Sequence, residues 1–154
     1  MTTRIAIGRG VPGIYQAMAH LQGEVDKAAA NAGVDGKLLE LVKIRTSQIN
    51  GCAFCLDMHT HDAIGMGESP RRIFVLEAWR EAELYTEQER AALALTESMT
   101  RIADTKDVPE DVYAEAVRVF TEEQYRVVAW AIITINSWNR IAVPSHSPLP
   151  DRSA

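Results

Sequence analysis

Signals for helix starts recur along the chain, and they constrain its fold more than any other feature. Three pairs have the spacing of capping boxes, which close the first turn of a helix: Thr86 with Glu89, Asp107 with Glu110, and Thr121 with Gln124. No segment of strand length alternates between apolar and polar residues. The sequence therefore predicts an all-α fold.

Further helices are predicted at residues 12–33, 35–50, 52–66 and 69–79, bounded by prolines, glycines and capping side chains. The chain has 154 residues, 47% of them hydrophobic, which is enough for one domain with a real core. We expect a single domain over residues 1–154, built as a compact bundle of six or seven helices. The proline- and serine-rich tail from about residue 144 is expected to be loosely held.

The last predicted helix, residues 121–143, is apolar around nearly its whole circumference. A helix of this kind is buried on every side, so it belongs at the centre of a bundle or between subunits. A single small bundle would leave part of this surface uncovered. The sequence therefore predicts a homo-oligomer.

Composition limits the partners and the cellular location that we expect for the protein. The net charge of −5 disfavours nucleic acid and anionic membrane surfaces as main partners, because both attract basic patches. No apolar run approaches the roughly 20 residues of a membrane span, and the N-terminus lacks the apolar core of a signal peptide. We expect a soluble cytoplasmic protein. In a reducing cytosol a cysteine pair indicates catalysis or metal binding more often than a structural disulfide.

The only two cysteines, Cys52 and Cys55, lie at the start of the helix predicted for residues 52–66. With Cys52 at zero, Cys55 lies at about −60°, His59 at about −20° and His61 at about 180° around the helix axis. Cys52, Cys55 and His59 therefore share one face, and His61 points away. A zinc site made of all four residues would require the helix to break.

The shared face suits redox chemistry, although two cysteines on a buried face can also be plain small hydrophobes. Residues three apart on a helix are close enough for a disulfide, and a helix start favours a thiolate at Cys52. His59, one turn beyond Cys55, is placed to take a proton from that thiol. We expect Cys55 to attack substrate and Cys52 to resolve the product.

Glu40 is the best candidate for a carboxylate that orients His59. If the chain folds back at Asn50-Gly51, Glu40 and His59 lie at similar heights on two antiparallel helices. The apolar neighbours of Glu40 would desolvate it and raise its pKa. The alternative is a solvated glutamate that pairs with Lys43 or Lys37.

These residues resemble the core motif of the alkylhydroperoxidase D-like branch of the carboxymuconolactone decarboxylase superfamily. The motif is a glutamate twelve residues before a Cys-x-x-Cys, with a histidine four residues after the second cysteine. Here it comprises Glu40, the run "KIRTSQINGCAFC" with Cys52 and Cys55, and His59. The tight match covers residues 40–67, and the helical organisation extends the resemblance over most of the chain.

The resemblance implies a compact all-helical fold, homo-oligomers that are often trimers or hexamers, and thiol-dependent peroxidase activity with no metal or organic cofactor. It implies that Cys55 attacks the peroxide, that Cys52 closes the disulfide, and that Glu40 and His59 relay protons. The implied partners are a peroxide substrate and a thiol or dithiol reductant. One departure is that Ala53 and Phe54 stand between the cysteines, where founding members of the branch carry a histidine.

Two other functions remain open at this stage. One is the lactone decarboxylase branch of the same superfamily, whose members lack the cysteine pair. The other is a non-catalytic helical oligomer that binds a metal through Cys52, Cys55, His59 and Glu40, a tetrahedral set of ligands.

Overall fold

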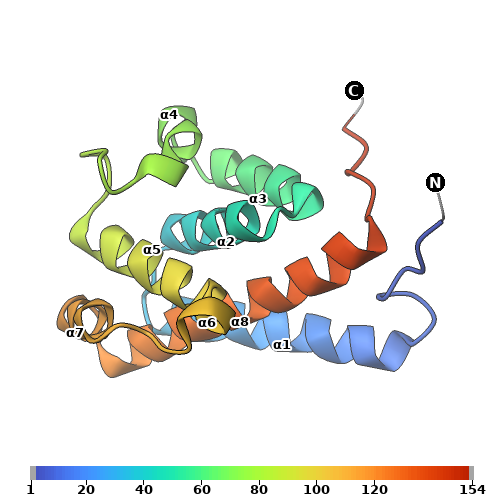
Figure 1. The fold of residues 1–154 in the computed structure, drawn as a ribbon, viewed down its shortest axis with the longest axis horizontal. Helices are drawn as coiled ribbons and strands as arrows, with labels where there is room; N and C mark the ends of the chain where they lie inside the picture. Colours follow the sequence, from blue (N-terminus) through green and yellow to red (C-terminus); the bar gives the residue numbers. More distant parts are fainter. Residues whose placement is uncertain (1–2, 153–154) are drawn as a thin grey trace.

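The computed structural model describes residues 3–152, which contain eight α-helices, one short 3-10 helix and no β-strand (Figure 1). In chain order these are α1 (Pro12–Asn31), α2 (Gly36–Asn50), α3 (Ala53–Gly65), α4 (Pro70–Phe74), η1 (Leu76–Ala78), α5 (Glu87–Thr100), α6 (Ile102–Thr105), α7 (Glu110–Val119) and α8 (Glu122–Ser145). The predicted all-α fold is confirmed. The count exceeds the predicted six or seven because the four-residue α6 follows α5, and the helix expected over 69–79 is split into α4 and η1.

Two of the three predicted capping boxes are present. Thr86 and Thr121 each accept a hydrogen bond from the third backbone N–H of their helix, and the side chains of Glu89 and Gln124 accept one in return. The third prediction is wrong. Asp107 accepts from the adjacent N–H of Val108 at 2.8 Å, and α7 starts at Glu110, because the extended Pro109 takes the N-cap position.

Helix α2 lies at the centre of the fold and packs against α3, α5 and α8 (Figure 1). Nine of its fifteen residues are buried. One apolar core fills the space among α1, α2, α5, α7 and α8, and a second joins α2, α3, η1 and α5. A third, smaller core between α3 and α8 holds both cysteines. Side chains at the end of α2 and the start of α3 are therefore fixed from several directions.

Helix α8 differs from the prediction in two respects. It includes Pro144 in its last turn, whereas the sequence predicted that this proline would end it. Its apolar circumference is also not covered on every side, since Trp130 is 49% exposed and Ile133 is 42% exposed. No helix within residues 3–152 has the length and apolar character needed to cross a membrane.

The C-terminal tail is held more firmly than the sequence suggested. Arg152 forms an ion pair with Asp57 of α3, with 2.8 Å between Nε and Oδ2. At the other end of the tail, the Ser145 hydroxyl accepts a hydrogen bond from the N–H of Ile7 at 3.0 Å. The tail therefore lies against the start of α3 and next to the N-terminal segment.

Candidate active site: a cysteine pair and a buried glutamate–histidine pair

The turn between α2 and α3 places Cys52 at a helix start. Gly51 ends α2 in the left-handed region, at φ +66°, which favours a residue without a side chain. The N–H of Cys52 then returns to the Ser47 carbonyl at 2.9 Å, and Cys52 is itself the N-cap of α3. The prediction that Cys52 lies at the N-terminal end of its helix is confirmed.

The two cysteines are free thiols in direct contact. Their Sγ atoms lie 2.7 Å apart, and the two residues are only 1% and 2% exposed. The Cys52 sulfur also accepts the backbone N–H of Cys55 at 3.4 Å. Ile135, Ala142 and Trp138 pack around them in the small core between α3 and α8. The pair is thus buried, apolar in its surroundings and pre-arranged for formation of an S–S bond.

The contact separates the acidities of the two thiols. The hydrogen bond from Cys55 lowers the pKa of Cys52 to about 7, against the opposing effect of burial and with help from the Cys55 N–H and the Asn139 side chain. The same hydrogen bond, together with burial, raises the pKa of Cys55. When the pair carries one negative charge, that charge therefore lies on the Cys52 sulfur. This direction is opposite to the sequence-based expectation that Cys55 is the attacking thiolate.

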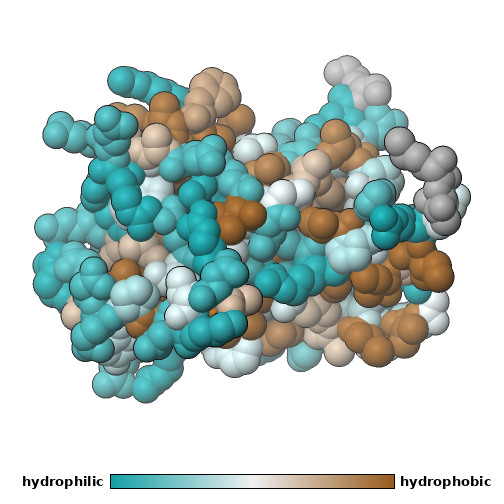
Figure 2. Space-filling view, in the orientation of Figure 1, coloured by the Kyte–Doolittle hydropathy of each residue, from teal (hydrophilic) through white to brown (hydrophobic). Residues whose placement is uncertain are grey.

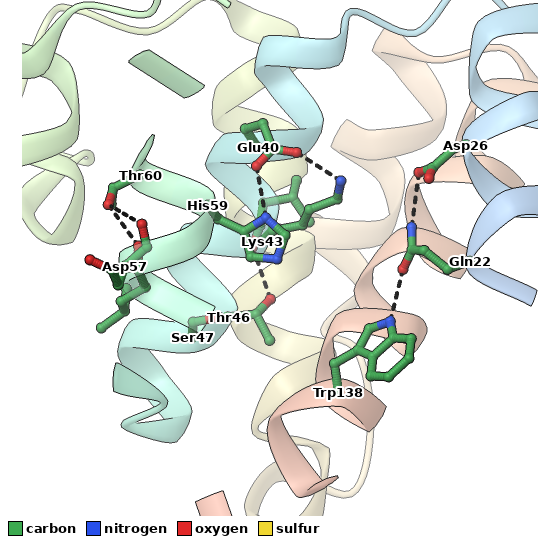
Figure 3. Close-up of polar contacts among 12 residues, drawn as sticks. Gln22, Asp26, Glu40, Lys43, Thr46, Ser47, Asp57, His59, Thr60 and Trp138 are labelled. Carbon is green, nitrogen blue, oxygen red and sulfur yellow. Dashed lines mark hydrogen bonds and ion pairs between the residues drawn. The ribbon is translucent and has the colours of Figure 1, made fainter. Parts of the chain in front are cut away.

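Glu40 and His59 meet as predicted. Glu40 is 3% exposed, and its Oε2 lies 2.8 Å from Nδ1 of His59 (Figure 3). Its other oxygen accepts from Lys43 Nζ at 2.8 Å, so the alternative partner proposed from the sequence is present too. His61 is exposed, as expected for the opposite face of the helix.

The predicted direction of the Glu40 pKa shift is wrong. Burial does act to raise the pKa, but the hydrogen bond and charge of His59 and the charge of Lys43 outweigh it, and the pKa is lowered. Glu40 is therefore a carboxylate near neutral pH and can only accept a hydrogen bond. It follows that Nδ1 of His59 carries the hydrogen, which leaves Nε2 of the neutral ring as a proton acceptor.

A metal site is not favoured by this arrangement. Among the residues that the structure describes, one group has ligand atoms close enough to share an ion: Glu40, His59 and the exposed Asp62, all within 4.8 Å of one another. It does not contain the cysteines that the sequence-based metal hypothesis required. The Lys43 ammonium group already pairs with Glu40, and its positive charge opposes a cation there.

Sequence reasoning missed Asn139, which lies at the centre of the site. This residue of α8 is 1% exposed, accepts from Asn50 Nδ2 at 2.9 Å and donates to Ser47 Oγ at 3.1 Å. Its side chain also lowers the pKa of both thiols. A buried polar side chain requires a buried partner, but α8 also carries Asn136 and Ser137 nearby, so the sequence alone does not single out Asn139.

A cavity of about 260 Å³ opens beside Cys52. Its walls are residues 51–54 on one side and Ala142, Val143, His146 and Ser147, at the end of α8, on the other. Neither Cys55 nor His59 belongs to its lining. Of the two cysteines, Cys52 is therefore the one that borders this cavity.

The fold and the site define a class: a small all-helical protein with a cysteine pair at a helix start, next to a buried glutamate–histidine pair. The chain belongs to the carboxymuconolactone decarboxylase family, whose model matches residues 12–98, more than half of the chain. The family resemblance noted in the sequence is thereby confirmed.

Similarity to other proteins extends beyond the residues that the family model matches. An uncharacterised Bacillus subtilis (strain 168) protein, YdfG, is 45% identical over 120 residues, covering 78% of this chain and 81% of that protein. A solved structure from Agrobacterium tumefaciens, of unknown function and provisionally assigned to the antioxidant-defence protein AhpD, is 37% identical with a TM-score of 0.88 and covers 98% of this chain and 100% of that one. An uncharacterised peroxidase-related protein from Silicibacter sp. TM1040 shares the fold, with a TM-score of 0.75 at 19% identity, covering 89% and 70% of the two chains.

Proposed function

We propose that the protein is a thiol-dependent peroxidase that cycles between the Cys52–Cys55 dithiol and its disulfide. The observation that carries this proposal is the 2.7 Å contact between two buried sulfurs, one of which has a pKa of about 7. A thiolate is the reactive form of cysteine, and a partner thiol at contact distance can close a disulfide without a change of fold. The AhpD assignment of the Agrobacterium relative supports the same reaction class.

In the first step the Cys52 thiolate attacks the terminal oxygen of a hydroperoxide. An S–O bond forms, the O–O bond breaks, and the alkoxide leaves and takes a proton from water. Cys52 is then a sulfenic acid. This step needs no base at Cys52, because its pKa already supplies a thiolate near neutral pH.

In the second step Cys55 attacks the Cys52 sulfur and expels the hydroxyl group as water. Cys55 needs a base for this attack, since its pKa is raised. His59 lies one helical turn further on the same face, where i, i+4 side chains are neighbours. In our proposal Nε2 of His59 takes the thiol proton and returns it to the leaving hydroxide, while Glu40 holds the ring and stabilises its charged form. Glu40, Cys52, Cys55 and His59 are thus the proposed catalytic set.

The disulfide must then be reduced by an external thiol or dithiol, and we place the protein in the cytoplasm, where such thiols are abundant. The test is peroxide consumption by the reduced protein with an excess of small dithiol, in the wild type and with each cysteine replaced by serine. Cys55→Ser should react once and stop at a sulfenic acid on Cys52, whereas Cys52→Ser should react slowly.

Sulfenic acid trapped instead on Cys55 of the Cys52→Ser protein would restore the order of attack that the family resemblance implies. If the wild type consumes no more peroxide than a variant lacking both cysteines, the proposed activity is wrong.

We also propose that the chain assembles with copies of itself, as a trimer or a hexamer. Figure 2 shows hydrophobic side chains gathered at the end of the molecule where α1 begins. There Ile5, Val11 and Ile14 are 88%, 53% and 71% exposed, a concentration of apolar surface that is typical of interfaces. Light scattering should give a multiple of 17.1 kDa; the monomer mass at micromolar concentration would contradict this proposal.

A further inference from the structure

The cavity beside Cys52 contains a second ionisable side chain, His146, that the proposed mechanism does not use. The cavity lies between the start of α3 and the end of α8 and has a volume of about 260 Å³, close to the lower end of small-ligand sites. Among its lining residues Cys52 and His146 are the two with ionisable side chains. The nearby tail carries Arg152, whose charge is paired with Asp57 of α3. Cys52 and His146 therefore border the same small cavity.

The backbone at His146 is unusual. Of the non-glycine residues in the described part of the chain, only Lys106 and His146 have a positive φ, and that of His146 is +48°. His146 occupies the position after α8 where the N–H of Ser147 returns to the Ala142 carbonyl at 3.1 Å, a helix end that normally takes glycine. A side chain there costs stability. Of Lys106 and His146, His146 is the one that borders the cavity, and residues in this conformation are common at functional sites.

We propose that this cavity receives a small thiol, and that His146 is the acid–base residue for its exchange with the disulfide at Cys52. The inference rests on the proposed redox cycle of Cys52 and Cys55. A reducing thiol must approach a sulfur on the side opposite the sulfur that leaves. Cys52 borders the cavity and Cys55 does not, so attack from the cavity falls on Cys52 with Cys55 as the leaving group.

His146 takes the proton of the incoming thiol, and the resulting thiolate forms an S–S bond to Cys52 while the Cys52–Cys55 bond breaks. Cys55 leaves as a thiolate and takes a proton from water. Its raised pKa makes it a slow leaving group but ensures that it is protonated once it has left. A second thiol, or the second arm of a dithiol, attacks the mixed disulfide. This releases Cys52 and the oxidised reductant, and the proton held by His146 returns to solvent.

The first assay measures reduction of the pre-formed disulfide by 2-mercaptoethanol, with free thiols followed against time over a range of pH. His146→Asn keeps a side chain that tolerates the left-handed region, and His146→Gly removes the strain. Both should slow the exchange by about 100-fold near neutral pH and lose one ionisation from the pH–rate profile. His146→Gly should also raise the denaturation midpoint, because glycine adopts the left-handed region without strain.

Lys106→Gly is the matched control. It relieves the same kind of backbone conformation at the end of α6, outside the lining of the cavity, so it should raise the midpoint without changing the exchange rate or its pH profile. Wild-type rates and pH profiles in both His146 variants would overturn the proposal.

A second assay separates this inference from the proposed peroxidase. The reduced protein is mixed with 2-hydroxyethyl disulfide, and the thiol released is measured. Here Cys52 attacks from the same cavity and protonated His146 gives its proton to the leaving thiolate, so no peroxide and no internal disulfide are needed. If Cys52 and Cys55 fail to form a disulfide, the proposed function falls, and the rates of the His146 variants in this assay still decide whether His146 assists exchange.

Discussion

Glu40 and Glu97 are two buried glutamates of the same fold, 3% and 7% exposed, and each has a pKa below the ordinary glutamate value. For both residues burial acts to raise the pKa and partners outweigh it. The partners differ in kind. Glu40 faces a histidine and a lysine, whereas Glu97 accepts from Arg45 Nε at 2.8 Å, from Trp79 Nε1 at 3.0 Å and from Arg80.

The difference is whether a partner can exchange a proton. An arginine guanidinium stays charged and an indole N–H is a donor only, so the Glu97 group can hold elements together but cannot pass protons. An imidazole can both accept and donate a proton, so the pair of Glu40 and His59 can take part in proton transfer. Burial and a shifted pKa are therefore insufficient to identify a catalytic carboxylate; the nature of its partner decides.

The largest effect is expected at Glu97. Glu97→Gln leaves the buried Arg45 and its neighbours without a countercharge, which should destabilise the fold by about 3–5 kcal/mol. Urea unfolding measures this loss, and thiol reactivity per folded molecule should be unchanged. Glu115→Gln removes an exposed partner of Arg118 and should have little measurable effect. If Glu97→Gln and Glu115→Gln lost equal amounts of unfolding free energy, Glu97 would not be the structural glutamate with which Glu40 is compared.

The next effect is expected at His59. His59→Gln should slow closure of the disulfide after peroxide attack by about 100-fold, because Cys55 loses its proposed base. The first reaction of Cys52 with peroxide should remain close to the wild-type rate. Rapid-mixing measurements of sulfenic acid and of disulfide separate the two steps. His61→Gln, on the exposed face of α3, is the control. If His59→Gln closes its disulfide at the wild-type rate, the pair of Glu40 and His59 takes no part in this step. Glu40 would then be a structural residue like Glu97.

The smallest expected effect is a fall in the free energy of unfolding at acid pH. Both glutamates have a folded-state pKa below the unfolded value, so their contributions are complete above that value and are lost as the pH falls through the folded pKa. The contribution of the two glutamates should be level between about pH 7 and pH 5 and then fall, by at most about 1.4 kcal/mol per pH unit for each carboxylate. Glu97→Gln should make the acid limb shallower in urea titrations at a series of pH values, and an unchanged slope would contradict the lowered pKa.

Features that depend on neighbouring residues were predictable from the sequence. The caps at Thr86 and Thr121, the turn at Gly51 and the shared face of Cys52 and His59 follow from local spacing. The approach of Glu40 to His59 was also predictable, because a hairpin of two helices fixes their relative heights.

Features that depend on distant packing were not predictable. The direction of the Glu40 pKa shift depends on burial, which raises the pKa, and on two charged partners, which lower it. Neither the burial nor the distances to the partners can be read from the sequence. Asn139 and His146 reach the site only because the end of α8 packs across the start of α3, more than 80 residues away in the chain.

One further consequence concerns Trp138. Its indole packs against the apolar core that holds the two cysteines and is fixed there by a hydrogen bond to Gln22 at 3.0 Å (Figure 3). Trp130 is exposed, and Trp79 is buried among arginines at the Glu97 group. Disulfides quench indole emission at short range, whereas thiols do so less strongly. The protein therefore carries an intrinsic optical reporter of its cysteine pair, in which light emitted by one tryptophan reads out the oxidation state without any added dye.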